Sequence, residues 1–303
     1  MNENAYRDIV LTGKEMAKKP LTLHKQAVGK DSSYGYPIAD TNFLSKKWAK
    51  EAGAYYFDLT DFLEAVHLGD KQKIENYKEQ LRTSNKIITS CLYLETDRKQ
   101  EGLKYGPYYE ALFTELKDVW KDSSQSKRNM VIPLILDFND MNENPKTRMA
   151  SHAAVACLNF NPKQDEADVI FLEQHAIKKG LLGPEYDYID TPENYDYTEG
   201  LQLHQELWES SLKNDVGIKQ INSFKNNTPI CPRTKCCGVV ATEVARRLLE
   251  ADNPMENVKI GIRIDEKEVD SLHMRNQKLE SSLKNQLSKT SNQVIPQLSK
   301  EME

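Results

Sequence analysis

Residues 235–249 read KCCGVVATEVARRLL, a turn of small residues followed by the pattern of an amphipathic helix. Val240, Val244 and Leu248 recur at helical spacing, which predicts that one face of this helix is buried. Two arginines stand near its C-terminal end, where positive charge interacts favourably with the helix dipole. Cys237 would begin the helix, and a thiol at a helix N-terminus loses its proton more easily. The stretch therefore predicts a reactive cysteine on a packed helix.

The composition is that of a large globular protein. The chain has 303 residues, with 41 basic and 46 acidic side chains and a net charge of −5, so we expect no nucleic-acid partner. Its first residues lack the apolar segment of a secretory signal, and no apolar run approaches the roughly 18 residues that cross a bilayer. Five cysteines, an odd number, argue against a disulfide framework and for a reducing compartment. We therefore expect a cytoplasmic protein with no membrane span and no cofactor.

Changes in composition divide the chain into four regions. Residues 1–40 are polar and rich in turn-forming residues, which predicts a weakly ordered lead-in. Residues 41–125 show mostly helical periodicity, and a polar break then leads into a catalytic core over 126–260. Residues 261–303 are predicted to form a polar helical tail.

Apolar stripes at helical spacing predict two helices in the second region and one in the tail. Asp58 or Thr60 would cap the first of these helices, and Gly69 would end it. The tail stripe is narrow, and we interpret that helix as solvated rather than as a partner surface. The stripes consist of Phe57, Leu59, Phe62, Leu63 and Val66; of Tyr109, Leu112, Phe113, Leu116, Val119 and Trp120; and of Val269, Leu272, Leu279, Leu283 and Leu287.

Short apolar runs of strand length appear in the third region, at 130–138, 153–158 and 169–172. A polar link with asparagines and a proline joins the second run to the third, as a turn between strands would. A helix over 200–213 and a strand over 216–224 are predicted to follow. Together these elements predict an α+β fold with a small mixed or antiparallel sheet between helices.

A histidine and a glutamate stand at the ends of two of these strands. His152 opens the second strand and Glu173 closes the third. In an antiparallel pair these two ends lie side by side, so the carboxylate can orient the imidazole and stabilise its charged form. Cys237, at a helix start facing this sheet edge, would complete a Cys–His–Glu triad. Each residue alone is more often structural, and it is their order along the chain that indicates catalysis.

This order of motifs resembles that of the clan CE cysteine enzymes. The clan includes the ubiquitin- and SUMO-deconjugating proteases, the adenoviral protease and the YopJ-type bacterial effectors. The similar segments are an Ile-Pro-Val-like strand, a strand begun by histidine, a strand ended by an acid and a Cys-Gly helix start. In this chain they are VIPLI at 131–135, HAAVA at 152–156, VIFLE at 169–173 and CCG at 236–238, within about residues 130–250.

The resemblance implies a papain-like core in which Cys237 is the nucleophile, His152 is the base and Glu173 is the acidic residue of the triad. The family usually has a glutamine six positions before the nucleophile, where it donates to the oxyanion, and this chain has Cys231 there. A thiol is a poor donor, so backbone N–H groups, or Gln220 under a shifted alignment, would have to serve.

A segment around residues 180–200 interleaves acidic residues with tyrosines. It is either a solvated loop or a docking surface for a basic protein, because tyrosine anchors interfaces and clustered acid attracts a basic partner. The sign of the charge suits ubiquitin. The candidate substrate-binding residues are Asp187, Asp190, Glu193, Asp196, Tyr188 and Tyr195.

The resemblance implies a cysteine protease or isopeptidase that removes ubiquitin or a ubiquitin-like protein from target proteins. One alternative is a YopJ-type acetyltransferase, which moves acetyl from acetyl-CoA to host Ser, Thr or Lys; the mixed charge of the stretch after Cys237 favours the deconjugase. The other is a non-catalytic binding module, including a metal site built from Cys231, Cys236 and Cys237, whose spacing suits tetrahedral zinc poorly. Many bacterial relatives are effectors, so delivery into a host cell without a Sec signal is compatible with the sequence.

Overall fold

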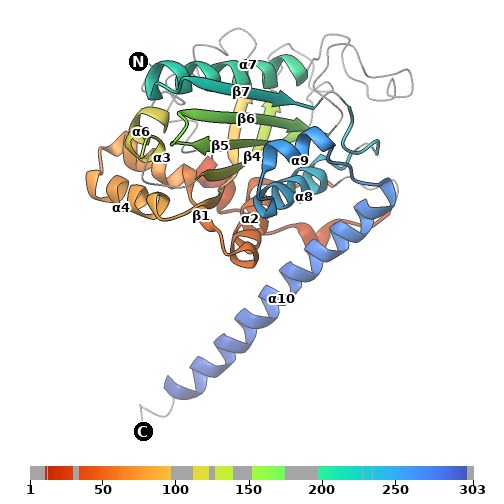
Figure 1. Ribbon diagram of the computed structural model, residues 1–303. Coiled ribbons are helices and arrows are strands. Elements are labelled where there is room, and N and C mark those ends of the chain that lie inside the picture. Colours follow the sequence, from red (N-terminus) through yellow and green to blue (C-terminus); the bar gives the residue numbers. More distant parts are fainter. Residues whose placement is uncertain are drawn as a thin grey trace, which may run out of the picture.

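A mixed β-sheet forms the centre of the molecule, and helices cover both of its faces (Figure 1). This arrangement confirms the predicted α+β class with a mixed sheet among helices. In this computed structural model, the side chains of 94–96, 136–138, 197–203 and 286–298 are not described. The structure describes residues 11, 13–29, 34–96, 112–122, 127–138, 152–174, 197–226, 228–233 and 235–298.

The sheet has the strand order β1-β2-β4-β5-β6-β7, and β3 continues along the same edge of β4 as β2. The pairs β4–β5 and β5–β6 are antiparallel, whereas the other pairs are parallel. The strands are β1 Tyr55–Phe57, β2 Lys86–Thr89, β3 Leu92–Thr96, β4 Arg128–Phe138, β5 His152–Asn161, β6 Glu166–Glu173 and β7 Gln220–Lys225.

Helices α3, α4, α6 and α7 pack on one face of the sheet, and α2, α8, α9 and the beginning of α10 pack on the other. The bounds are η1 Leu23–Lys25, α2 Ile38–Ala52, α3 Leu59–Leu68, α4 Lys71–Arg82, α6 Lys117–Trp120, α7 Tyr197–Ser211, η4 Leu212–Val216, α8 Cys237–Glu250, α9 Pro254–Ile260 and α10 Glu266–Leu298. Asp58 caps α3 through its side chain and Gly69 ends it, as predicted.

The central strands divide the hydrophobic core into two layers. Successive side chains of a strand point to opposite faces, so Ala154 and Ala156 join one layer while Val155 joins the other. Phe171 and Leu172 of β6 separate in the same way. Burial on both faces explains why these strands read as continuous apolar runs rather than as an alternating pattern.

The second region is not purely helical as predicted, because β1, β2 and β3 belong to the sheet. These strands have only three to five residues, too few for a period of two to stand out beside the helical stripes. Phe57 belongs to β1, although its position relative to Leu59, Phe62 and Leu63 predicted that it is part of the helix that follows. The predicted strand over 216–224 is shorter and later, since Val216 ends η4.

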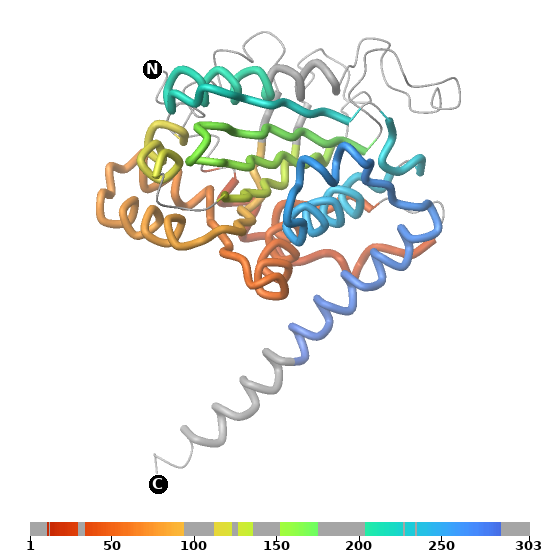
Figure 2. Tube along the Cα trace, viewed as in Figure 1, coloured from red at the N-terminus to blue at the C-terminus, as the bar shows by residue number. Residues whose placement is uncertain are grey.

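The described part of the lead-in packs against the first half of the tail helix, so this half of the helix is not solvated on all sides. Tyr34 and Tyr36 are almost fully buried, and their hydroxyls bond to Asp270 and His273 of α10. The rings of Tyr34 and His273 stack with centroids 4.2 Å apart. Farther along, Gln277 and Glu280 of α10 contact η1, and the helix then extends away from the body (Figure 2). Aromatic and polar contacts across the sequence, invisible to local periodicity, therefore fix the beginning of α10.

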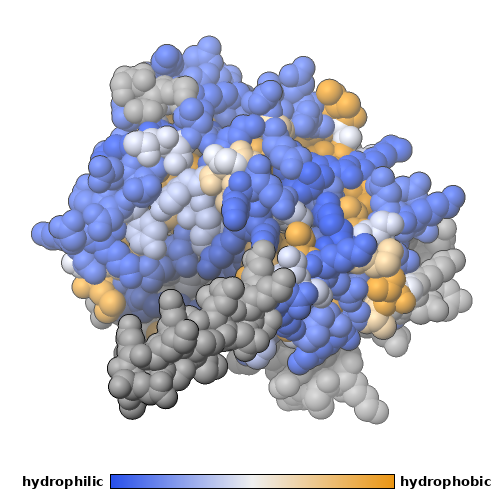
Figure 3. All heavy atoms as spheres, turned by 90° about the horizontal axis from the view of Figure 1, so that it is seen from below, coloured by the Kyte–Doolittle hydropathy of each residue, from blue (hydrophilic) through white to orange (hydrophobic). Residues whose placement is uncertain are grey.

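The surface is mostly hydrophilic when seen from below, with small separate hydrophobic patches (Figure 3). Within the described ranges, no helix is both long enough and apolar enough to span a membrane. The large apolar side chains with the greatest exposure there are scattered, and they are Leu11, Val28, Leu68, Ile260 and Met274.

Candidate active site

Cys237 is the first residue of α8, as the sequence predicts. The apolar face of α8 is buried against β2, β4 and β5, and it includes Val240, Val244 and Leu248. Cys237 is partly exposed, whereas its neighbour Cys236 is fully buried. The hydrogen bond with Cys231 and burial raise the pKa of the Cys236 thiol well above its usual value. Of the two cysteines, only Cys237 therefore has exposed surface.

His152 and Glu173 meet at the end of the β5–β6 pair. Glu173 lies opposite Ala154, and His152 is two residues earlier on the same side of the sheet, because side chains alternate along a strand. The His152 Nε2 atom lies 2.8 Å from the Glu173 Oε1 atom. Both side chains are buried, with 6% and 3% exposure. The expected hydrogen-bonding contact between the two is thus present.

The side chains of Cys237 and His152 lie close enough for each to shift the pKa of the other, and the backbone N–H of Ala153 acts on the sulfur in the same direction as His152. On the imidazole, Nε2 faces Glu173. The three side chains therefore form one chain of contacts: carboxylate, imidazole and thiol.

These contacts favour a thiolate beside an imidazolium. Burial opposes the charged form of His152, but hydrogen bonds with Cys237 and Glu173 outweigh it and raise the pKa of His152 to about 10. Burial likewise opposes the thiolate, and the hydrogen bond and positive charge of His152 outweigh it, so the pKa of Cys237 is lowered. The site therefore favours ionisation of the Cys237 thiol.

Gln174 connects the end of β6 to the loop that precedes the cysteines. Its side-chain Nε2 donates to the Arg233 carbonyl and contacts the Cys236 sulfur at 3.2 Å. Its backbone carbonyl accepts from the Ile230 N–H at 2.8 Å. The residue is nearly fully buried. Its adjacency to Glu173 was visible in the sequence, but contacts with a loop more than fifty positions later were not.

A short strap, residues 34–37, packs its backbone directly on the start of α8. The N–H of Tyr34 donates to the carbonyl of Lys235 at 2.7 Å. A Cβ atom at Gly238 would lie only 2.6 Å from the Tyr34 carbonyl oxygen and 2.4 Å from the Tyr36 nitrogen. The glycine after the cysteine is therefore required by this close backbone approach.

Gly238→Ala is expected to lower the free energy of unfolding by about 3 kcal/mol, because its clash is with backbone atoms that cannot rotate away. Denaturant unfolding measures the loss. Gly35→Ala in the same strap is the matched control, since nothing lies within 4 Å of its added Cβ, and it should cost less than about 0.5 kcal/mol. Equal stabilities for the two variants would contradict the required close approach.

Gln220 does not lie at this site, which corrects its assignment as an oxyanion donor. It opens β7 opposite Glu166, at the other end of β6 from Glu173. Its exposed amide donates to Glu166 at 3.1 Å. The shifted alignment therefore selected a residue at the wrong end of the sheet. The candidate substrate-binding residues Asp187, Asp190, Glu193, Asp196, Tyr188 and Tyr195 lie outside the described residues.

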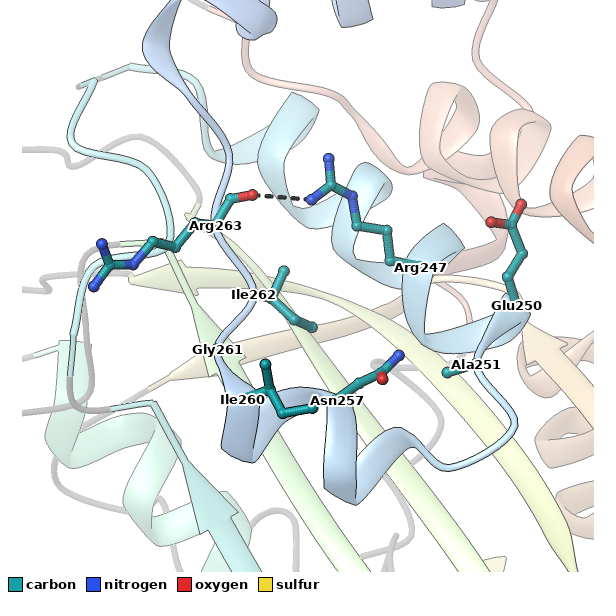
Figure 4. A pocket seen from close by; sticks show the side chains of 8 residues that line it. All are labelled: Arg247, Glu250, Ala251, Asn257, Ile260, Gly261, Ile262 and Arg263. Carbon is teal, nitrogen blue, oxygen red and sulfur yellow. Dashed lines mark hydrogen bonds between the residues drawn. The ribbon is translucent and has the colours of Figure 1, made fainter.

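The other end of α8 borders an open hollow of about 640 Å³ (Figure 4). Arg247 donates to the carbonyl of Arg263 across it at 2.9 Å, and also to the buried Glu243. None of the three contacting side chains of the candidate active site lines this hollow. In the described part of the chain, no group of three or more His, Cys, Asp or Glu side chains is arranged to hold a metal ion.

No model of a protein family matches the sequence, and no curated protein matches it. Among solved structures, the Legionella pneumophila effector protein RavZ matches with a TM-score of 0.35 and 10% identity, over 61% of this chain and 46% of that one. RavZ in complex with human LC3B matches with a TM-score of 0.34 and 10% identity, over 57% and 44%. An ASFV protease matches with a TM-score of 0.29 and 12% identity, over 83% and 97%. This chain thus spans less than half of either RavZ structure, and such TM-scores assign neither a family nor an activity.

Proposed function

We propose that the protein is a thiol-dependent hydrolase in which Cys237 is the nucleophile, His152 the general acid and base, and Glu173 the residue that orients the imidazole. The observation that carries the proposal is the hydrogen bond between Glu173 and His152, together with the mutual interaction of His152 and the Cys237 thiol at the start of α8. Covalent catalysis requires a nucleophile, a base in contact with it and a third group that orients the base.

Hydrolysis proceeds through a thioester on Cys237. The thiolate attacks the carbonyl carbon, which forms a C–S bond and places negative charge on the carbonyl oxygen. Protonated His152 gives its proton to the leaving nitrogen as the C–N bond breaks. Neutral His152 then takes a proton from water, which attacks the thioester and releases the acid product and the thiolate. Backbone N–H groups in the first turn of α8 have no acceptor within the helix, and we assign them to the oxyanion in place of Gln220.

The substrate that we propose is an isopeptide bond at the C-terminus of ubiquitin or a ubiquitin-like protein. This choice rests on the order of motifs that resembles the clan CE enzymes. The acidic, tyrosine-rich segment around 180–200 supports it through charge, because a negative surface attracts a basic protein.

Ubiquitin and SUMO that carry an electrophile at the C-terminus test the substrate class, with acetyl-CoA turnover measured in parallel. We expect a covalent adduct with at least one of these proteins, located on Cys237 by peptide mass spectrometry. Formation of an acetyl-enzyme and acetylation of protein substrates, without any adduct, would replace the hydrolase by the acetyltransferase alternative. If neither an adduct nor acetyl transfer is observed, both enzymatic functions are contradicted.

Neutralising Asp187, Asp190, Glu193 and Asp196 together is expected to raise KM for a protein substrate by about threefold to tenfold, because clustered charge acts mainly on the association rate. The salt dependence of KM should weaken as well. Turnover of a small peptide ester should stay unchanged and serves as the control. Equal losses on both substrates would mean that the segment supports the active site itself and not protein docking.

A further inference from the structure

Glu173, whose carboxylate contacts His152, lies at the end of β6, just beyond the point where β7 stops pairing with that strand. The pairing of β7 with β6 ends where Lys225 lies opposite Phe171, two residues before Glu173. On its other side Glu173 pairs with Ala154 of β5. The main chain of Glu173 therefore needs a hydrogen-bonding partner on the β7 side that regular pairing does not supply.

The side chain of Asn226, the residue that follows β7, supplies both bonds. Its Oδ1 accepts from the Glu173 N–H at 2.9 Å, and its Nδ2 donates to the Glu173 carbonyl at 2.7 Å. The same Nδ2 also donates to the Thr228 carbonyl at 3.1 Å. Asn226 is only 6% exposed. An amide side chain here takes the place of a peptide group, since it offers one acceptor and two donors in one plane.

These bonds matter for chemistry because Glu173 reaches His152 across a single short contact. A 2.8 Å hydrogen bond loses strength steeply with distance and angle, so the position of the Glu173 main chain sets how well its carboxylate meets the imidazole. Among the described residues, the ionisable groups that shift the pKa of the His152 ring include Cys237 at the start of α8 and Glu173 at the end of β6. Any displacement of Glu173 therefore changes the protonation of His152 directly.

We propose that Asn226 is a positioning residue of the active site: its side-chain amide fixes the main chain of Glu173 so that the carboxylate holds and charges His152. The inference rests on the proposed thiol hydrolase, and it adds a fourth residue whose role is exerted through Glu173. It also assigns the turn after β7 to the catalytic machinery.

The pH dependence of Cys237 alkylation by iodoacetate tests this role without any substrate. Iodoacetate is an anion, so it reacts fastest while Cys237 is a thiolate and His152 is still an imidazolium, and the rate falls on the alkaline side as His152 loses its proton. In Asn226→Ala we expect this alkaline fall to move to lower pH by about one unit, towards its position in Glu173→Gln. With a working substrate, kcat should fall by about tenfold while KM changes little.

Asn222→Ala is the matched control. Asn222 lies on β7, a few residues before Asn226, and its amide donates to Glu166 at 2.6 Å and to Asp168 at 3.0 Å, at the far end of β6 from Glu173. Asn222→Ala also removes a side-chain amide, but away from Glu173, so the fall in alkylation rate at alkaline pH should stay unchanged. Asn226→Gln carries the test if Asn226→Ala does not fold: it keeps the amide and adds no charge, but its extra methylene cannot place both bonds, so the alkaline fall should again move down.

Two outcomes overturn the inference in different ways. If His152→Ala has the same pH dependence of Cys237 alkylation as the wild type, Cys237 and His152 do not form an ion pair. The proposed hydrolase then fails together with the role of Asn226. If the wild type depends on His152 but folded Asn226 variants keep its profile, the hydrolase stands and Asn226 only stabilises the turn.

Discussion

Cys237→Ala is expected to abolish turnover and labelling by C-terminal electrophiles, with a loss on the order of 10⁴-fold or more. In the proposed mechanism the sulfur forms the covalent bond to the substrate, so no other group can compensate for its removal. Cys237 is a partly exposed residue at the start of α8, so a smaller residue there should leave the fold intact. Activity assays and intact-protein mass spectrometry measure the two losses, and circular dichroism checks the fold.

Cys236→Ala is the matched control, because it removes the neighbouring thiol. Cys236 is fully buried and its pKa is raised, so it should contribute to stability and not to labelling. An inactive Cys236→Ala together with an active Cys237→Ala would show that the nucleophile is the other cysteine.

His152→Ala is expected to reduce turnover about 10³-fold or more and to change the pH dependence of Cys237 alkylation by neutral iodoacetamide. His152 lowers the pKa of Cys237 more than any other group does, and burial raises that pKa. Without His152 the thiolate should therefore form only at higher pH. The alkylation rate at pH 7 should fall by roughly 100-fold and recover as the pH rises.

The pH dependence of wild-type activity follows from the ionisation of the same two residues, Cys237 and His152. Activity should rise with pH as Cys237 ionises, below the usual range of a thiol, and fall again near pH 10 as His152 loses its proton. His67→Ala, on the exposed end of α3, is the control histidine and should leave both limbs unchanged. If His152→Ala kept the wild-type rate at pH 7, the thiol would be activated by another group.

The elements that the sequence predicted well are those with a local signal. The apolar face of α8 repeats at helical spacing, and the runs of β4, β5 and β6 are apolar throughout because both faces of these strands are buried. Placing His152 and Glu173 at facing strand ends needed only the assumption of an antiparallel pair, and the register of β5 and β6 satisfies it. Their hydrogen bond could therefore be expected before the structure was known.

The elements that the sequence misplaced depend on partners far along the chain. β1 has three residues and becomes a strand because β2 pairs with it, while Gln220 is excluded from the site by a register between β6 and β7. Tyr34 and Tyr36 are buried against the start of α8 and against α10, both of which lie about 200 or more positions later in the chain.

Periodicity and motif order along the chain thus determined the nucleophile helix, the central strands and the candidate triad. Only the tertiary structure decided which backbones meet at Gly238 and which amide supports Glu173. The physical reason is that a hydrophobic pattern records which side of an element is buried, which is a local property. A hydrogen bond such as that between Asn226 and Glu173 joins residues 53 positions apart and has no local signature.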